Sequence, residues 1–262
     1  MPDLPLYDAI ILRIFENHYS KKKAGFEFDR EELVTVAEKL GLKNPKNLGD
    51  LIYSFRYRKP LPDAITATAN KGLEWIIEPA GRSKYRFRLT AVSRIVPRDD
   101  PIVVKIPDAT PEIIAANALG DEQALLAKVR YNRLIDIFLG ITTYSLQNHL
   151  RTTVKGMGQI EIDEVYVGVN RAGQQFVIPV QAKGGHDQLA VIQTRQDMAC
   201  CLEKFSGLKC RPVSAQFMRG DTIAMFELGI QDAEIRVVEE KHYRLVASDQ
   251  ITPEDLQSYA ER

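Results

Sequence analysis

The chain has 262 residues, of which 45% are hydrophobic and 27% are charged, which excludes a disordered protein and predicts one large core or two modest ones. Its apolar runs are shorter than the ~18 residues that a membrane helix requires, and its charged start does not predict a signal peptide. We therefore expect a cytoplasmic protein without membrane contact. The cysteines, Cys200, Cys201 and Cys210, form no CxxC pair, so we expect reduced, structural thiols.

Charge is divided unevenly along the chain, although the total net charge is zero. Residues 1–98 contain 18 Lys and Arg against 12 Asp and Glu, and the remaining residues contain 17 against 23. The first part therefore carries +6 and the second part −6. This asymmetry fits a DNA-binding domain joined to a site rich in carboxylates, and it also fits ordinary variation of surface charge.

Three short helices are predicted in the N-terminal part. Apolar residues at helical spacing predict the first helix over residues 7–18. The second helix is expected to follow Asp29, as its cap, and to end near Leu40. The third helix is expected to begin at Asn44-Pro45, because proline is favoured in the first turn of a helix.

A short strand at Phe26-Glu27-Phe28 and a hairpin over residues 73–78 and 84–89 complete a predicted winged helix-turn-helix domain, residues 1–95. Its third helix and its hairpin would contact double-stranded DNA, with Lys and Arg at phosphates and Asn and Ser near base edges. The same side chains also fit the solvated surface of a domain that contacts proteins. The expected DNA-binding residues are Lys46, Asn47, Ser54, Arg56, Arg58, Lys59, Arg82, Lys84 and Arg86.

A proline-rich segment, residues 96–110, is expected to be a linker to a second domain, residues 111–262. Helices are predicted over residues 111–118, 121–139 and 144–150, and a later helix over about 187–205. Further strands are predicted over residues 211–218, 222–229 and 234–246.

A β-hairpin is predicted where the hydrophobic period changes, with strands over residues 159–169 and 175–183 joined by the turn Asn170-Arg171-Ala172-Gly173. A hairpin centred near Ala172 pairs residue 163 with residue 181 and residue 161 with residue 183. Strand alternation then places four polar side chains on one face. They are Glu161, Asp163, Gln181 and Lys183.

This group suits phosphodiester hydrolysis. That reaction needs a hard cation that takes up charge on the phosphate and lowers the pKa of an attacking water, and Mg²⁺ binds through one or two carboxylates. Asp163 is the expected ligand, with Glu161 and the amide oxygen of Gln181 as further candidates. Lys183 would orient the water and stabilise developing negative charge.

Asp163 followed by Gln181-Ala182-Lys183 resembles the motif of the PD-(D/E)xK nuclease superfamily, which includes many type II restriction endonucleases. The resemblance covers about residues 111–220. It implies an α/β fold of the α+β type, with a restriction-endonuclease-like core in which helices flank a central mixed sheet. It also implies Mg²⁺ as the cofactor, and a winged helix is a known partner of this core.

Two positions depart from the family pattern. Ile162 stands where the family has proline, and Gln181 stands at the acidic position, so a charge is missing. Glu161, Glu164 on the same strand, or Glu122 on a helix could supply that charge, and otherwise these residues are charges that pair across strands. His186 could approach the scissile phosphate or be a turn residue, and His149 is expected to be structural. Gln193 and Asp197 could line the cleft or form a polar helix face.

We therefore expect a Mg²⁺-dependent, site-specific DNA endonuclease that works as a homodimer on a palindromic site. A glycine-rich phosphate loop is missing from the sequence, so no nucleotide cofactor is expected. Two alternatives stay open: a repair or branched-DNA nuclease of the same fold, and a transcriptional regulator whose nuclease-like domain is inactive.

Overall fold

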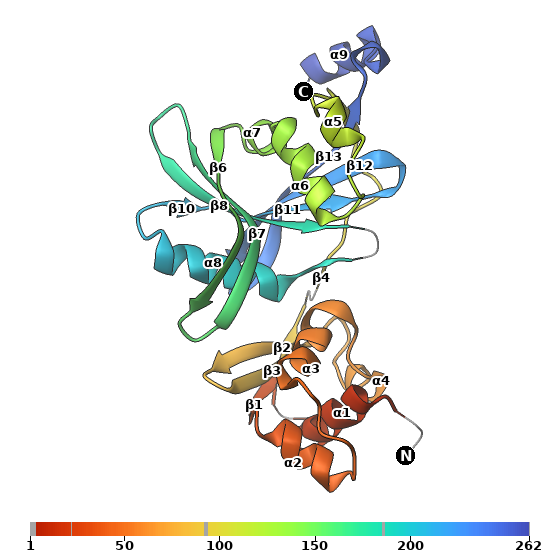
Figure 1. Cartoon of the computed structure of the whole chain (residues 1–262), viewed down its shortest axis with the longest axis vertical. Coiled ribbons are helices and arrows are strands. Elements are labelled where there is room, and N and C mark those ends of the chain that lie inside the picture. Colours follow the sequence, from red (N-terminus) through yellow and green to blue (C-terminus); the bar gives the residue numbers. More distant parts are fainter. Residues whose placement is uncertain (1–3, 22, 92–93, 185–186, 262) are drawn as a thin grey trace. The chain divides into compact units, whose positions relative to one another are not determined.

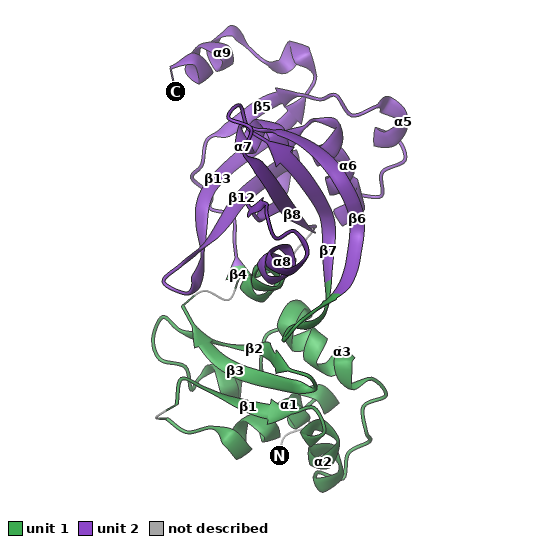
Figure 2. Cartoon of the chain, turned by 90° about the vertical axis from the view of Figure 1, so that its left-hand side faces the viewer, with its two compact units in different colours: residues 1–94, 153–160, 190–196 green, residues 95–152, 161–189, 197–262 purple. Residues whose placement is uncertain are grey.

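The computed structural model describes residues 4–21, 23–91, 94–184 and 187–261 (Figure 1). Contacts divide the chain into two compact units (Figure 2). Unit 1 comprises Met1–Arg94, Thr153–Ile160 and Ala190–Gln196, and unit 2 comprises Ile95–Thr152, Glu161–Leu189 and Asp197–Arg262. Within the described ranges no helix has the length and apolar character needed to span a membrane.

Unit 1 combines short helices with a three-stranded antiparallel sheet of order β1-β3-β2. Phe87 in the central strand is opposite Phe26 on one side and Ile77 on the other, and its ring packs against those of Phe15, Phe26, Phe28 and Trp75. The elements are α1 (Leu6–His18), β1 (Gly25–Asp29), α2 (Glu32–Lys39), α3 (Leu48–Tyr53), the π-helical segment η1 (Ser54–Arg58), α4 (Asp63–Thr66), β2 (Glu74–Gly81) and β3 (Lys84–Thr90). The expected helix over residues 7–18, the strand at residues 26–28 and the hairpin are confirmed.

The third helix begins later than the sequence pattern predicts. The expectation of a start at Asn44-Pro45 is wrong, because the Oδ1 atom of Asn47 accepts hydrogen bonds from the backbone nitrogens of Gly49 and Asp50. A side-chain oxygen that satisfies these first backbone donors fixes Asn47 as the N-cap. Asp29 is likewise not the cap of α2, since it ends β1 and its backbone nitrogen donates to Glu32.

Unit 2 is a mixed α/β structure with a central mixed sheet flanked by helices. The strand order is β5-β13-β12-β11-β8-β7-β6, and β10 pairs with β8. The pairs β5/β13 and β8/β11 are parallel, and β7/β8, β11/β12 and β12/β13 are antiparallel. The strands are β5 (Val103–Pro107), β6 (Thr142–Val154), β7 (Gly158–Val169), β8 (Gln175–Lys183), β10 (Lys209–Cys210), β11 (Val213–Phe217), β12 (Thr222–Gln231) and β13 (Glu234–Val246).

Helices lie on both faces of this sheet (Figure 1). Ile178, Val180 and Ala182 of β8 share one buried cluster with residues of α6 (Glu122–Tyr131) and α7 (Leu134–Leu139). Gln181 alternates with them along the strand and contacts α8 (Val191–Lys204) on the opposite face. The other short elements are β4 (Arg94–Ile95), α5 (Glu112–Ala115), β9 (Leu189–Ala190), η2 (Arg219–Asp221), η3 (Ser248–Gln250) and α9 (Pro253–Ala260).

Three expectations for this part of the chain are wrong. The segment over residues 144–150 is not a helix but lies within β6, where β-branched residues at both ends and pairing with β7 favour an extended chain. Residues 96–110 are more than a linker, because they contain β5, which pairs with β13. The predicted helix over residues 121–139 is divided into α6 and α7 at Arg133, whose φ of 50° is left-handed.

The predicted register of the β7–β8 hairpin is confirmed over the pairs from Glu164 opposite Val180 to Val169 opposite Gln175. The expected pairing of Asp163 with Gln181 lies one residue beyond these pairs and stays a prediction. The predicted strands over residues 211–218, 222–229 and 234–246 correspond to β11, β12 and β13, and the helix expected over residues 187–205 corresponds to α8.

Candidate functional site

Asp163 is held in place by the strand opposite it. Its side chain is half-buried on β7, and its Oδ2 atom accepts a 2.8 Å hydrogen bond from the backbone nitrogen of Ala182. Ala182 lies between Gln181 and Lys183 on β8, so this bond fixes the aspartate beside both of them. One carboxylate oxygen of Asp163 is engaged by the backbone in this way.

Gln181 connects the hairpin to α8. Its side chain is 2% exposed, and its Nε2 atom donates to Oδ1 of Asp197 at 3.2 Å and to Oδ2 at 3.1 Å. The same nitrogen donates to the backbone oxygen of Glu161 at 3.2 Å. All three neighbours are acceptors, so the amide nitrogen belongs at this position. Gln181 therefore orients an acidic side chain that comes from the helix.

Asp197 is 2% exposed, and burial raises its pKa well above the ordinary aspartate value. The hydrogen bond from Gln181 and the charge of Lys183 oppose this rise, and the charge of Asp163 adds to it. The pKa of Asp163 is also raised, first by burial and then by Glu122 and Glu161, while Lys183 and the Ala182 amide oppose the rise. The two aspartates and Lys183 thus form one interacting group.

Glu161 and Glu122 lie at the edge of this group. The exposed carboxylate of Glu161 pairs with Nη2 of Arg151 at 3.2 Å and with Nδ1 of His149 at 3.4 Å. The N-terminus of α6 passes close to the end of β8, since a Cβ atom built on Gly184 would lie 3.7 Å from the backbone nitrogen of Glu122. Both glutamates are near enough to raise the pKa of Asp163.

Glu164 occupies the opposite face of the sheet. It is fully buried, and its Oε1 atom accepts from Nε of Arg130 at 2.9 Å and from the hydroxyl of Ser145. Strand alternation and these two partners direct its carboxylate away from Asp163. The expectation that Glu164 could supply the negative charge that Gln181 lacks is therefore wrong. His186, which was expected to approach the phosphate or to be a turn residue, lies outside the described residues.

The site offers two carboxylates to a hard divalent cation, those of Asp163 and Asp197. Within the described residues, three or more His, Cys, Asp or Glu side chains do not come together as a metal-binding group. Mg²⁺ needs only one or two carboxylates, with water and substrate oxygens as the other ligands. Burial raises the pKa of both Asp163 and Asp197 and neighbouring negative charges add to the rise, and a bound cation would oppose both effects.

Several basic and polar residues expected at DNA are engaged within unit 1. Lys59 pairs with Asp8 and lies 4.3 Å from the centroid of the Phe55 ring. The Arg86 guanidinium pairs with Glu27 at 2.5 Å and with Glu78 at 3.7 Å. Asn47 caps α3, as described above, and Ser54 donates to the backbone oxygen of Asp50. These contacts reduce the charge and donor capacity that these residues can offer to DNA.

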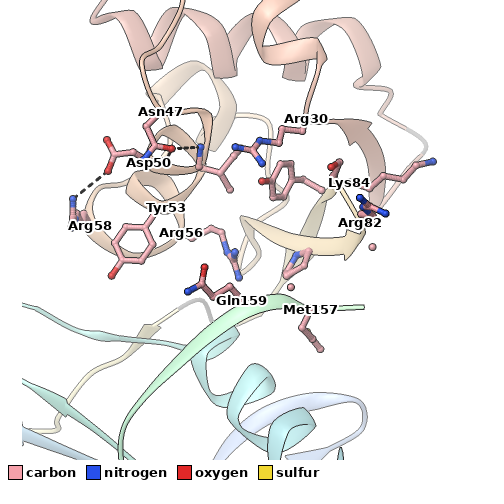
Figure 3. Close-up of a pocket in the computed structure, with 17 residues that line it drawn as sticks. Arg30, Asn47, Asp50, Tyr53, Arg56, Arg58, Arg82, Lys84, Met157 and Gln159 are labelled. Carbon is pink, nitrogen blue, oxygen red and sulfur yellow. Dashed lines mark hydrogen bonds and ion pairs between the residues drawn. The ribbon is translucent and has the colours of Figure 1, made fainter. Parts of the chain in front are cut away.

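The remaining basic residues except Lys46 gather around a cavity in unit 1 (Figure 3). Lys46 is exposed and does not line this cavity. Arg30, which the sequence did not single out, joins Arg56 and Arg58 in its wall. Arg82 and Lys84 of the β2–β3 hairpin also line it.

Sequence reasoning left the role of Asp197 open because a polar position on an amphipathic helix is ordinary. The only sequence signal was its place one helical turn after Gln193 in a segment expected to follow the hairpin.

Comparison with known proteins gives no family model, no curated protein and no solved structure that matches this chain.

Proposed function

We propose that the chain is a Mg²⁺-dependent, site-specific DNA endonuclease of the PD-(D/E)xK type, with unit 1 as its winged-helix DNA-binding part. The observation that carries the proposal is the meeting of Asp163, Lys183 and Asp197 around Gln181 at the end of the β7–β8 hairpin. An acid on the strand, a lysine two residues after Gln181 and a second acid from α8 together provide the charges that phosphodiester hydrolysis uses.

Each residue has a distinct role in this proposal. Asp163 and Asp197 would hold the metal ion, and Gln181 would orient Asp197 through its amide nitrogen. When bound, Mg²⁺ supplies Lewis-acid stabilisation of the phosphate and lowers the pKa of water. Lys183, whose charge acts on both aspartates, would hold the attacking water and stabilise charge on the phosphate oxygens.

The arrangement of unit 1 supports DNA binding. Its helices are followed by the β2–β3 hairpin, and β1 pairs with β3 to close a small sheet, as in a winged helix. Five basic side chains gather around one cavity between α3 and this hairpin, and Lys and Arg favour phosphates. Cutting both strands requires two sites, and the described part of the chain offers one candidate group, so a homodimer is expected.

The direct test is cleavage of plasmid and phage DNA by the purified protein, with Mg²⁺ and with EDTA. The variants are Asp163→Ala and Lys183→Ala, and the matched control is Glu239→Gln, a partly exposed acid on β13. Discrete fragments that require Mg²⁺, persist in the control and disappear in both site variants would support the proposal.

A second candidate is a DNA-binding regulator with an inactive nuclease-like unit, which the neutral Gln181 favours. Wild-type protein that binds modified and unmodified DNA, and cleaves neither with Mg²⁺, would contradict the nuclease proposal and support this candidate.

A further inference from the structure

The cavity in unit 1 has the size and charge of a ligand site. Its volume is about 680 Å³, within the range of pockets that hold small organic molecules. Arg30, Arg56, Arg58, Arg82 and Lys84 line it, and Asp50 is the acidic residue among its lining residues. Such an excess of positive charge in a concave surface raises the local concentration of anions.

Among these residues, Arg56 gives the strongest indication that the cavity binds an anion. Its Nε and Nη2 atoms are buried and have no hydrogen-bond partner among the residues that the structure describes, and the same holds for Nε of Arg30. A buried charged donor without a partner is costly, so a native structure normally satisfies it with a protein group, a water or an ion. In Figure 3 the Arg56 side chain extends from η1 toward Gln159, along the wall of the cavity.

Two other basic side chains of the cavity, those of Arg58 and Lys84, form long ion pairs with their acidic partners. Nη1 of Arg58 lies 3.6 Å from Oδ1 of Asp50, and Nζ of Lys84 lies 3.9 Å from Oδ1 of Asp29. Both pairs are exposed, so they contribute little and can exchange for another anion. Phosphate is the biological oxyanion that arginine binds best, because its oxygens match the two-pronged guanidinium group.

Aromatic side chains in the same wall add a second kind of contact. Tyr53 is 45% exposed and Tyr85 is partly exposed, and both line the cavity. The Arg58 guanidinium lies 4.7 Å from the centroid of the Tyr53 ring. Aromatic rings beside cations are the combination that binds a nucleobase together with its phosphate.

We infer that this cavity binds a single nucleotide, with its phosphate at Arg56 and Arg30 and its base against Tyr53. The nucleotide is either free or one unit of a DNA strand turned out of the base stack. This assignment rests on the DNA-binding part of the proposed function and is independent of cleavage.

The test uses the full chain in EDTA, so that nuclease activity plays no part. Isothermal titration calorimetry compares a deoxynucleoside monophosphate, inorganic phosphate and a deoxynucleoside that lacks phosphate. We expect saturable 1:1 binding of the monophosphate, weaker binding of inorganic phosphate and no detectable binding of the deoxynucleoside. Arg56→Gln should weaken monophosphate binding about tenfold or more, because it removes charge-assisted hydrogen bonds.

The matched control is Arg86→Gln, since Arg86 is a basic residue of the same hairpin that pairs with Glu27 and Glu78. It should bind the monophosphate within about twofold of the wild type, because Arg86 is not among the residues that line the cavity. Arg30→Gln provides a second variant if Arg56→Gln does not fold. Monophosphate binding that is not saturable, or an equal loss in Arg56→Gln and Arg86→Gln, would overturn the inference.

A duplex that carries 2-aminopurine identifies the source of the nucleotide, because this base becomes fluorescent when it leaves the stack. An increase in 2-aminopurine fluorescence with the wild type, but not with Arg56→Gln, supports a nucleotide from DNA. Monophosphate binding without this increase in fluorescence supports a free nucleotide. Duplex binding and cleavage without monophosphate binding would remove the inference and leave the proposed function. Monophosphate binding without any DNA cleavage would remove the proposed nuclease function and leave the inference about the cavity.

Discussion

Replacing Asp197 with asparagine should make the protein more stable at pH 8 and far less active. Burial raises the pKa of Asp197 in the folded chain above that of an unfolded aspartate, which is about 3.9. Between these two values the folded chain retains a proton that the unfolded chain has lost. Stability conferred by this group is therefore complete below about pH 3.9 and is lost as the pH rises through the folded pKa. Asparagine does not titrate, so the variant does not lose this stability as the pH rises.

The magnitude follows from two opposing effects. Asparagine keeps one oxygen for the Gln181 amide, so the variant loses one of two charge-assisted acceptors, worth about 1.5–3 kcal/mol. It also removes the cost of either ionising this buried acid or keeping it protonated at pH 8, which is about several kcal/mol in proteins. The second effect is larger, so we expect a net gain of about 1–2 kcal/mol at pH 8 and a difference near zero at pH 4.

Two measurements test this reasoning, namely thermal unfolding across pH 4–8 and the rate of Mg²⁺-dependent DNA cleavage. The cleavage rate should fall about 100-fold or more, as when an enzyme loses one preorganised charged group. The matched control is Glu164→Gln, a fully buried acid on the same strand as Asp163 but on the opposite face. It leaves Arg130 without its charged partner, so we expect lower stability by about 1–3 kcal/mol and nearly unchanged cleavage. Wild-type cleavage by Asp197→Asn, or a stability difference that does not change with pH, would refute the reasoning.

Lys183→Met should reduce cleavage about 100-fold or more while duplex binding stays within about threefold, as measured by gel cleavage and fluorescence anisotropy. Gln181→Glu should lower both stability and cleavage at pH 8, because it places a third buried acid beside Asp163 and Asp197; a fully active variant would contradict this. Gly25→Ala should destabilise unit 1 by about 1–3 kcal/mol in denaturant titrations, since its Cβ atom would lie 2.6 Å from the backbone oxygen of Phe87. Gly207→Ala is its control, because no atom of a described residue beyond its two chain neighbours lies within 4 Å of a Cβ atom built there, and it should change stability little.

Local patterns predicted the elements whose stability is decided within a few residues. The β7–β8 hairpin has alternating strands and a short turn in which Asn170 accepts from the backbone nitrogens of Ala172 and Gln174, so its register could be derived before the structure. Strand β6 was missed for the opposite reason. Its exposed, polar residues form no clear pattern, and pairing with β7 determines its conformation.

The candidate site could be predicted only for the side chains that share the hairpin. Asp163, Gln181 and Lys183 were found because strand alternation places them on one face. The acid that accompanies them comes from α8, and its approach depends on how that helix packs on the sheet. Sequence spacing contains no measure of that packing, so the sequence indicates Glu161 and Glu164 on the same strand as acids that could compensate for the neutral Gln181.

The placement of the second acid explains why a neutral residue suits position 181. Gln181 is buried between the sheet and α8, and one amide nitrogen reaches both carboxylate oxygens of Asp197. A carboxylate at that position would face Asp197, whose pKa the charge of Asp163 already raises, and like charges so close cannot all ionise. A neutral donor avoids this repulsion and still fixes the direction of Asp197. Gln181 therefore orients an acid from the helix without adding a charge of its own.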